Sequence, residues 1–577
     1  MILKALYDYY HRHSNLPKKG LELKEIGYLI VIDNSGTFLG IESRMIDKKH
    51  AQQFLVPQTV QRSGRKYIGN YLWDNCEYVT GYSEKNQEKA VLCNKAFIER
   101  VEELKREIPQ NVIVNAIYNF YNKYPIIYNV LKDDVLWKEM STSTKNISFL
   151  LRGSVSIAAV EDDVICFSGE STEKAGVRTC LVTGIRGKIA RVHAKVPLQG
   201  NAFSSLVSFK DGKGYDSYGK EQGANAPISE ETAFAYTTVL NHLLASDSRN
   251  KFTVGNRTFL FWASKDDEAG QQAEESFFTL FGFDEQKDYP NKNIEQVRKV
   301  FEAIYKGTLK TTSEDTFYIL GLAPNAARIA VTYWAEIPLR KFAETICRHF
   351  NDMEIIDTRL KKKTYASLQN IISSVTLDGK VSDATPNLAD AVVKSIFEGL
   401  PYPQTLFTSC TRRNRAESEN KKWNEAVKKG WIITRAAIIK AYLNRIDNNH
   451  IITKKMNKDN TNPGYLCGRL FAVVERIQEI SNRENDYFTN LRSNYMNTAS
   501  TAPSAVFPTI LNLSVHHSDK LDKKDVIQFE RDKQEIIGKL IDFPNQLSLQ
   551  DQGRFFIGYY HQRQDFFMKN DENNNKQ

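Results

Sequence analysis

The chain has 577 residues, of which 41% are hydrophobic and 25% are charged. A chain of that length is too long to fold around one hydrophobic core, so we expect about three or four folded units. The composition excludes a largely disordered or fibrous chain. The formal net charge of +9, from 78 basic and 69 acidic residues, is too small to make the whole surface polycationic, so any nucleic-acid site must come from a local cluster.

The seven cysteines are scattered, odd in number and without a C-x-x-C spacing. This pattern favours neither a disulfide framework nor a zinc site. The amino-terminal sequence MILKALYDYYHRHSNLPKKG carries charges and histidines where a signal peptide needs an apolar run, and no long apolar run follows. We therefore expect a cytoplasmic protein with no membrane partner and no cofactor.

Residues 1–140 are predicted to form a β-rich N-terminal region with a basic loop. Two apolar runs flank Asp33–Gly36, whose sequence DNSG is typical of a hairpin turn. A second strand pair is predicted around Asp74 and Asn75. Residues 86–140 show a helical pattern.

Residues 141–345 are predicted to form an α/β body that carries the loop SYGKEQGANAPIS, Ser217–Ser229. The runs DDVICFSGE and TCLVTGIRGKIARVHAKVP resemble strands, so we expect the sheet to continue past residue 200. After Ser229 the apolar residues recur with a period of about 3.6, and Glu230 and Glu231 occupy the first turn, which predicts a helix. The apolar segment TFYILGLAPNAARIAVTYWAEIP is predicted to be a strand that returns to the sheet.

Residues 346–455 are predicted to be a helical connecting region, and residues 456–577 a C-terminal helical bundle. Asn462 and Pro463 supply a cap and a first-position proline ahead of an apolar stripe. The predicted fold class is α+β, with a mixed α/β N-terminal body containing β-hairpins, followed by an all-α C-terminal helical bundle.

A search for catalytic motifs favours a protein that is not an enzyme. The sequence contains no G-x-x-x-x-G-K-[ST], H-E-x-x-H or G-x-S-x-G pattern. Asp284, Glu285 and Lys287 have the residue types of a metal-dependent nuclease, but such a charged run is more often a solvated loop. His516 and His517 lack the further ligands of a metal site, so a capping or packing role is favoured.

The glycine-containing loop is the first candidate binding site. Gly219 and Gly223 permit unusual backbone turns, and Lys220 offers a positive charge. Gln222 and Asn225 carry the amides that can bond bidentately to an adenine edge. The acidic first turn of the following helix argues against a phosphate there, so base contact is favoured. A glycine loop shaped only for packing is the equally weighted alternative.

Residues 61–75 are the second candidate site. They contain three cations that suit phosphates and three amide or aromatic residues beside them: Arg62, Arg65, Lys66, Asn70, Trp73 and Asn75. A tryptophan on a strand is more often a core residue. Two further basic runs, RLKKK at 359–363 and RRNR at 412–415, suit either a nucleic-acid backbone or a solvated helix face.

Eight stretches, in order along nearly the whole chain, carry a resemblance to a known family. They are MILKALYDYY, YLWDNCEYVTGY, CLVTGIRGKIARVHAKV, VSFKDGKGYDSYGKEQGANAPISEETAFAYTTVLNHLL, LAPNAARIAVTYW, RAAIIKAYLNR, NPGYLCGRLFAVVERIQ and FPTILNLSVHHSDKL. Together they resemble the large subunit of the type I-C (Dvulg subtype) CRISPR Cascade surveillance complex.

The resemblance implies a function that the composition does not show. In such complexes CRISPR RNA supplies sequence specificity by base pairing, and the large subunit recognises the protospacer-adjacent motif in duplex DNA and helps to open it. The implied partners are the CRISPR RNA-bearing backbone and RNA-processing subunits, target double-stranded DNA and a helicase-nuclease recruited in trans. A separate small subunit made of the C-terminal bundle is also implied, and Met456 is placed to be its internal start. A metal-dependent nuclease and a general RNA-binding scaffold are the alternative functions.

Overall fold

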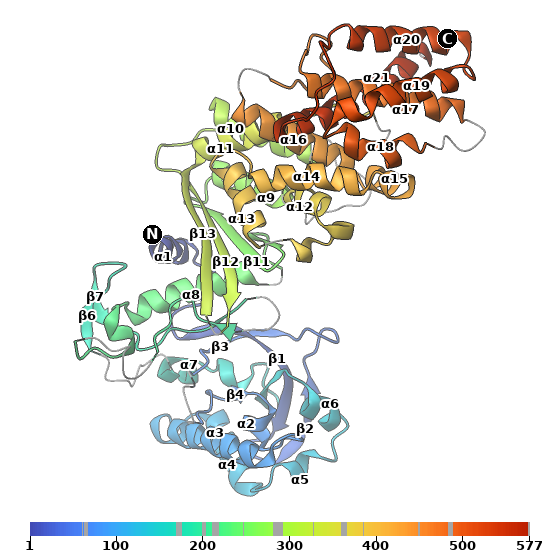
Figure 1. Ribbon diagram of the computed structural model, residues 1–577. Coiled ribbons are helices and arrows are strands. Elements are labelled where there is room, and N and C mark those ends of the chain that lie inside the picture. Colours follow the sequence, from blue (N-terminus) through green and yellow to red (C-terminus); the bar gives the residue numbers. More distant parts are fainter. Residues whose placement is uncertain are drawn as a thin grey trace. The chain divides into compact units, whose positions relative to one another are not determined.

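The computed structural model describes residues 1–60, 62, 67–168, 176–198, 203–210, 218–245, 247–280, 292–326, 328–358, 366–384, 386–447, 451–482 and 489–574. The chain divides into two compact units (Figure 1). The first comprises Met1–Pro197 and Ala202–His242, and the second Leu198–Asn201 and Leu243–Gln577. The fold class is α+β, as predicted. The four domain boundaries proposed from the sequence stay predictions.

The first unit is built on a five-stranded sheet with the order β2-β1-β5-β4, in which β3 also pairs with β1. The strands are β1 (Leu21–Ile32), β2 (Phe38–Ser43), β3 (Gln53–Pro57), β4 (Trp73–Asp74) and β5 (Asn146–Leu151). The predicted hairpin at Asp33–Gly36 is confirmed, since it joins the antiparallel strands β1 and β2. The Asp33 carboxylate accepts backbone N–H groups of Ser35 at 2.9 Å and Thr37 at 2.8 Å, which fixes the turn.

Helices cover this sheet and enclose one hydrophobic core with it. They are α2 (Cys76–Thr80), α3 (Gln87–Glu107), α4 (Val112–Lys123), α5 (Tyr128–Leu131), α6 (Trp137–Thr142) and α7 (Asp162–Ser168). Phe97, Phe120 and Phe149 are fully buried where α3, α4 and β5 meet.

Two strand predictions in this unit are wrong. The pair expected around Asp74 and Asn75 is only the short strand β4, because Asn75 ends it and caps helix α2 by accepting the Tyr78 N–H at 3.3 Å. The described part of the run DDVICFSGE, Asp162–Ser168, forms helix α7, whose first turn carries Asp162 and Asp163 at the positive end of the helix dipole.

The remainder of the first unit comprises two small hairpins and two helices. The elements are β6 (Val177–Thr179), β7 (Arg186–Lys188), β8 (Val196–Pro197), β9 (Phe203–Ser204), α1 (Ile2–Arg12) and α8 (Glu230–Leu244), whose last residues belong to the second unit. The strands pair as two separate two-stranded sheets, so the predicted continuation of the first sheet is wrong. The helix predicted after Ser229 is confirmed as α8, and α1 packs on it through an edge-on contact of Tyr10 and Phe234 at 5.9 Å.

The second unit begins with a four-stranded antiparallel sheet in the order β10-β11-β12-β13. The strands are β10 (Lys251–Val254), β11 (Arg257–Ala263), β12 (Thr316–Asn325) and β13 (Arg328–Pro338). The segment predicted as one strand returning to the first sheet is therefore a hairpin, β12–β13, in a different sheet. Phe261, Phe277 and Phe317 join β11 and β12 to helix α9 in an aromatic core.

Helices form the rest of the second unit. They are α9 (Glu268–Leu280), α10 (Lys292–Lys306), α11 (Leu339–Met353), α12 (Leu368–Val375), α13 (Pro386–Phe397), α14 (Gln404–Ala416), α15 (Asn420–Lys428), α16 (Trp431–Ile446), α17 (Pro463–Ser481), α18 (Leu491–Ala499), α19 (Phe507–Ser518), α20 (Lys523–Ile537) and α21 (Leu549–Asn574). The predicted cap is confirmed, because Asn462 accepts the Tyr465 N–H at 3.1 Å and Pro463 opens α17. No helix among the described residues is both long enough and apolar enough to span a bilayer.

Helices α17 and α21 lie side by side at very close range (Figure 1). A Cβ added at Gly468 would lie 1.9 Å from the Phe555 carbonyl oxygen, and one at Gly558 would lie 2.1 Å from that of Tyr465. These glycines therefore let the two helix backbones touch.

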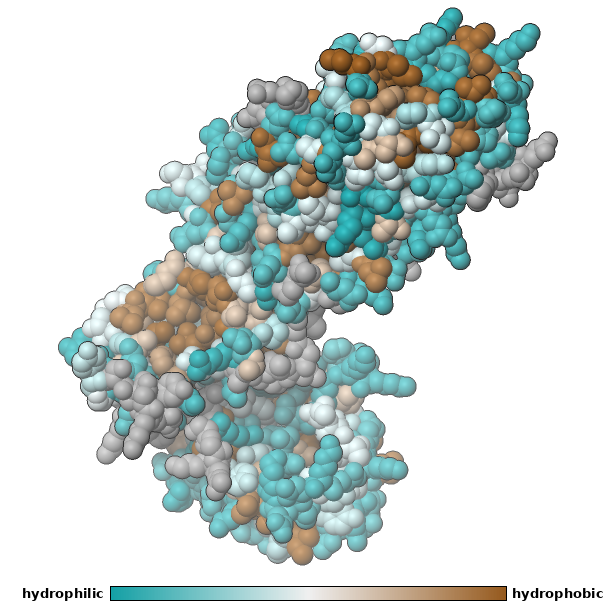
Figure 2. Space-filling model, viewed as in Figure 1, coloured by the Kyte–Doolittle hydropathy of each residue, from teal (hydrophilic) through white to brown (hydrophobic). Residues whose placement is uncertain are grey.

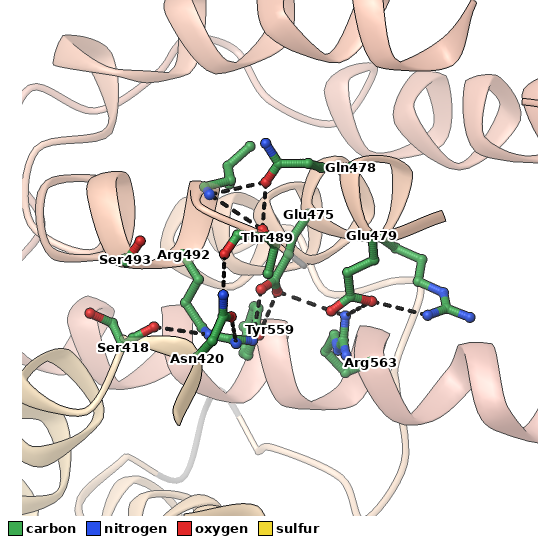
Figure 3. Close-up of polar contacts among 12 residues, drawn as sticks. Ser418, Asn420, Glu475, Gln478, Glu479, Thr489, Arg492, Ser493, Tyr559 and Arg563 are labelled. Atoms are coloured by element: carbon green, nitrogen blue, oxygen red, sulfur yellow. Dashed lines mark hydrogen bonds and ion pairs between the residues drawn. The ribbon is translucent and has the colours of Figure 1, made fainter. Parts of the chain in front are cut away.

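A buried ion-pair network crosses the same helix pair (Figure 3). Glu475, which is fully buried, accepts from Arg492 at 2.8 Å and from the Tyr559 hydroxyl at 2.6 Å. Arg563 lies 2.8 Å from Glu479 and 3.8 Å from Glu475. Each buried charge thus has an opposite charge beside it, which offsets the cost of desolvation.

Candidate nucleic-acid interface

In the second candidate segment, residues 61–75, the described residues are 62 and 67–75, and a buried carboxylate, Asp74, links them. Asp74 accepts hydrogen bonds from the Arg62 guanidinium and from the Asn70 backbone N–H at 3.1 Å. Arg62 also donates through Nε to the Ile68 carbonyl at 2.8 Å. Burial raises the pKa of Asp74, although the charge of Arg62 opposes that shift. Arg62 is therefore engaged in holding the two sides of the loop together.

Three other predicted residues of this loop make structural contacts. These contacts are Val60 N–H to Asn70 Oδ1 at 3.0 Å, Trp73 Nε1–H to the Pro57 carbonyl at 3.0 Å, and Tyr78 N–H to Asn75 Oδ1 at 3.3 Å. Asn70 and Trp73 are each 2% exposed, so neither is available at the surface. Arg65 and Lys66 lie outside the described residues, as do residues 359–363.

The first candidate loop is described from Tyr218 and makes a compact turn that ends in the short helix Gln222–Asn225. Tyr218, Gly219 and Gln222 all have positive φ angles, of 52°, 68° and 42°. Gly223 is essential for space, because a Cβ there would lie 2.0 Å from the Ala190 carbonyl oxygen. The turn therefore packs closely against the backbone of Ala190, in the segment that follows hairpin β6–β7.

The two amides of this turn have different partners. Asn225 donates through Nδ2 to the carbonyls of Lys220 and Gln222, each at 3.1 Å, so this group stabilises the turn itself. Gln222 accepts from Arg191 Nη1 at 2.7 Å through Oε1. Its Nε2 group bonds to no described residue. Lys220 is exposed and forms no ion pair within the described part of the chain.

Hairpin β6–β7 and the residues after it carry a set of cations that the sequence analysis did not single out as a cluster, and two of them, Arg178 and Arg191, contact this turn. Residues 176–198 contain five basic residues and no acidic residue: Arg178, Arg186, Lys188, Arg191 and Lys195. Arg178 reaches the turn, with Nη1 lying 3.4 Å from the Ala224 carbonyl. Residues Ile189 and Ser229 form a β-bridge, which holds the hairpin at the start of α8 (Figure 1). A charge count along this stretch would have identified it.

These cations differ from several buried arginines of the second unit. Within the described residues, Arg178, Arg186, Arg191 and Lys195 form no ion pair with a carboxylate. In contrast, buried arginines of the second unit have carboxylate partners: Arg435 with Glu417 at 2.6 Å, Arg469 with Glu535 at 2.8 Å and Arg492 with Glu475 at 2.8 Å. A group of exposed cations without acidic partners is typical of a site for a polyanion.

Apolar side chains are exposed on the same hairpin. Val177 is 56% exposed, Leu181 63% and Ile185 65%. Leu181 and Ile185 flank the turn at Gly184, whose φ is 73°. Figure 2 shows both hydrophobic and hydrophilic residues on the visible surface where Figure 1 draws α8. The hairpin thus combines positive charge with an apolar tip.

Reactive thiols and metal-ligating clusters would support other kinds of chemistry, and the buried thiol of Cys180 is the first candidate among the described residues. Burial by itself raises the pKa of a thiol, but hydrogen bonds involving Thr232 and Ser229 lower that of Cys180 to about 6. Cys180 is only 1% exposed, so this thiol is closed to a substrate. Among the described residues no group of three or more His, Cys, Asp or Glu side chains is placed to hold a metal ion.

The other two enzyme-like candidates are the acidic run and the histidine pair. Asp284, Glu285 and Lys287 lie outside the described residues. His517 contacts the Ser481 hydroxyl at 3.1 Å and the Gln478 amide at 3.3 Å, which is a packing role.

Comparison with protein families identifies the chain. A family model described as CRISPR-associated protein (Cas_Csd1) matches residues 6–567. Because that match covers nearly the whole chain, the protein belongs to the Cas_Csd1 family of CRISPR-associated proteins. No curated protein matches the chain.

Proposed function

We propose that this CRISPR-associated protein is the non-catalytic large subunit of a type I-C RNA-guided surveillance complex, and that it recognises the protospacer-adjacent motif in duplex DNA. The observation that carries the proposal is the cluster of exposed cations without acidic partners around the glycine turn. We name it the hairpin–turn site, made of Arg178, Arg186, Arg191, Lys220 and Gln222. Family membership supports assembly with other components of a CRISPR effector.

The residues of the hairpin–turn site divide between two tasks. Its cations suit phosphate groups, which position a protein on DNA without reading sequence. Gln222 suits a base edge, because its Nε2 bonds to no described residue while Arg191 orients its Oε1. Asn225 donates to a carbonyl within the turn, so we assign it the role of positioning Gln222 and not that of contacting the motif.

The apolar tip of the hairpin suits the opening of the duplex. Leu181 and Ile185 are exposed beside the cations, and apolar side chains inserted between base pairs unstack them. In this proposal the opened DNA then pairs with CRISPR RNA held by the backbone and RNA-processing subunits, and a helicase-nuclease is recruited in trans. A small subunit translated from Met456 belongs to the same proposal.

One binding experiment with the full-length chain tests this function. The Arg178→Gln/Arg186→Gln variant should bind all duplexes more weakly. The logarithm of its association constant should also fall less steeply with the logarithm of the salt concentration, by about 1.8 in the magnitude of the slope, since two phosphate contacts are lost. Gln222→Ala should keep that slope but lose discrimination between duplexes with different adjacent motifs.

The matched control removes two exposed cations that have acidic partners. Lys306 pairs with Glu302 and Lys341 with Glu344, so Lys306→Gln/Lys341→Gln should leave DNA binding unchanged. Equal salt slopes for the two double variants would refute the hairpin–turn site. A wild-type preference for RNA over duplex DNA in competition would instead favour an RNA-binding scaffold.

A further inference from the structure

Tyr218 has an unusual combination of backbone strain and exposure. Its side chain is 99% exposed, and it makes no hydrogen bond or ring contact with a described residue. Its φ of 52° places it in the left-handed region, which non-glycine residues rarely adopt.

Backbone strain is concentrated in this turn. Five described non-glycine residues have a positive φ, and two of them, Tyr218 and Gln222, lie four positions apart here. Gly219, also left-handed, lies between them. Strain of this kind persists only where the surrounding structure enforces it, and it clusters at ligand sites. The enforcing contacts are visible, because Asn225 bonds to two carbonyls of the turn and Gly223 packs on Ala190.

The other groups of the hairpin–turn site indicate the ligand's chemistry. Lys220 and Arg191 supply positive charge, and Gln222 supplies an amide donor that no described residue occupies. An exposed aromatic ring next to cations is the combination that binds unpaired nucleic-acid bases, since the ring stacks on the base while the cations attract the backbone.

We propose that Tyr218 stacks on an unpaired nucleobase, so that the hairpin–turn site takes a junction between duplex and single strand in preference to a fully paired duplex. This inference rests on the proposed function and specifies its substrate. Bases inside a duplex are already stacked on their neighbours, so the ring gains a partner only where a base is unpaired. The backbone of the turn exposes the ring before DNA arrives, so binding a base does not have to break a contact between the ring and a described residue.

The test uses the full-length chain and forked DNA that carries 2-aminopurine at successive positions across the junction. Stacking quenches this fluorescent base, so the wild-type protein should quench it at one position. Tyr218→Ala should abolish the quenching and weaken binding of the fork about tenfold, while binding of a fully paired duplex changes less than twofold. Tyr218→Phe should keep both properties, because the ring and not the hydroxyl makes the contact.

Tyr305→Ala is the matched control, since Tyr305 is 42% exposed on helix α10, and this variant should behave as wild type. Unchanged quenching and fork affinity in Tyr218→Ala would overturn the inference, as would an equal loss of affinity for fork and duplex. If the inference about Tyr218 fails but Arg178→Gln/Arg186→Gln still weakens duplex binding, the proposed function stands on its own. Wild-type protein that binds neither DNA overturns both.

Discussion

Single residues in the first unit determine whether the glycine turn can form. The Gly223 N–H donates to the Arg191 carbonyl at 3.0 Å, and its Cα faces the Ala190 carbonyl so closely that no side chain fits. Contact with backbone is harder to relieve than contact with a flexible side chain. The position of Gln222 therefore depends on its neighbour having no Cβ.

We predict that Gly223→Ala destabilises the first unit by about 1–3 kcal/mol through overpacking and abolishes motif discrimination. Urea unfolding and a duplex-binding assay would measure the two effects. Gly176→Ala is the control, because a Cβ at Gly176 would meet nothing within 4 Å and should have no effect. Wild-type stability and binding in Gly223→Ala would show that the turn tolerates displacement.

At the scale of helices, the second unit contains a network of paired charges buried between its helices. Helices α17, α18 and α21 share the network in which Glu475 bonds to Arg492 and Tyr559 (Figure 3). Removing one partner of a buried ion pair leaves the other charge without compensation, which costs more than the pair contributes.

We predict that Glu475→Gln lowers the free energy of unfolding of the second unit by about 3–5 kcal/mol, because Arg492 stays charged and buried. Glu419→Gln serves as the control: Glu419 is 63% exposed and lies 3.2 Å from Lys422, so its loss should cost less than about 1 kcal/mol. Chemical denaturation of both variants makes the comparison. Equal costs for the two substitutions would contradict this account of the network.

At the scale of the whole molecule, buried histidines link stability to pH. Burial lowers the pKa of His349 and His561 to about 3 and that of His193 to about 4. Each ring contacts a tyrosine hydroxyl, those of Tyr402, Tyr465 and Tyr236 respectively. All three pKa values lie below the 6.5 of an exposed histidine, so the unfolded chain takes up protons first as the pH falls.

Stability should therefore be lost as the pH falls below about 6.5, by up to about 1.4 kcal/mol per pH unit for each buried histidine. The second unit contains two of these histidines and the first unit one. Between pH 6.5 and pH 5, the free energy of unfolding measured with urea should therefore fall about twice as far for the second unit as for the first. Glu535, whose pKa is lowered to about 2, adds its effect only at lower pH. Midpoints that stay constant over this window would contradict the prediction.

The sequence predicts elements whose signals are local. The hairpin at Asp33–Gly36 has a turn sequence, α8 has an acidic first turn, and α17 has a cap. Both helices also have an apolar stripe, so all three elements are found where expected. Pairing between distant segments leaves no such local signal, which is why the sequence predicts the β12–β13 segment to join the wrong sheet. Short elements such as α2 depend on one cap, Asn75, and are easily missed.

The candidate site follows the same rule. The glycine turn is visible in the sequence, but the partners of Gln222 and Gly223 lie about thirty residues earlier, at Arg191 and Ala190. The role of Arg62 likewise depends on the burial of Asp74, which a linear sequence does not show. The residue types therefore indicate that the segment can bind nucleic acid. Tertiary contacts decide which of its side chains are available to do so.

The close packing of α17 and α21 has a consequence for any protein that starts at Met456. Both helices, their glycine contacts and the acceptor Glu475 would be inherited intact, since all lie after that residue. Arg492, however, also donates to the Ser418 carbonyl at 3.1 Å and to Asn420 Oδ1 at 2.7 Å, and both acceptors precede Met456. The shortened product would have to replace these two acceptors with water or with a neighbouring subunit. A guanidinium that is fully bonded inside the full-length chain would then be available for a contact between subunits.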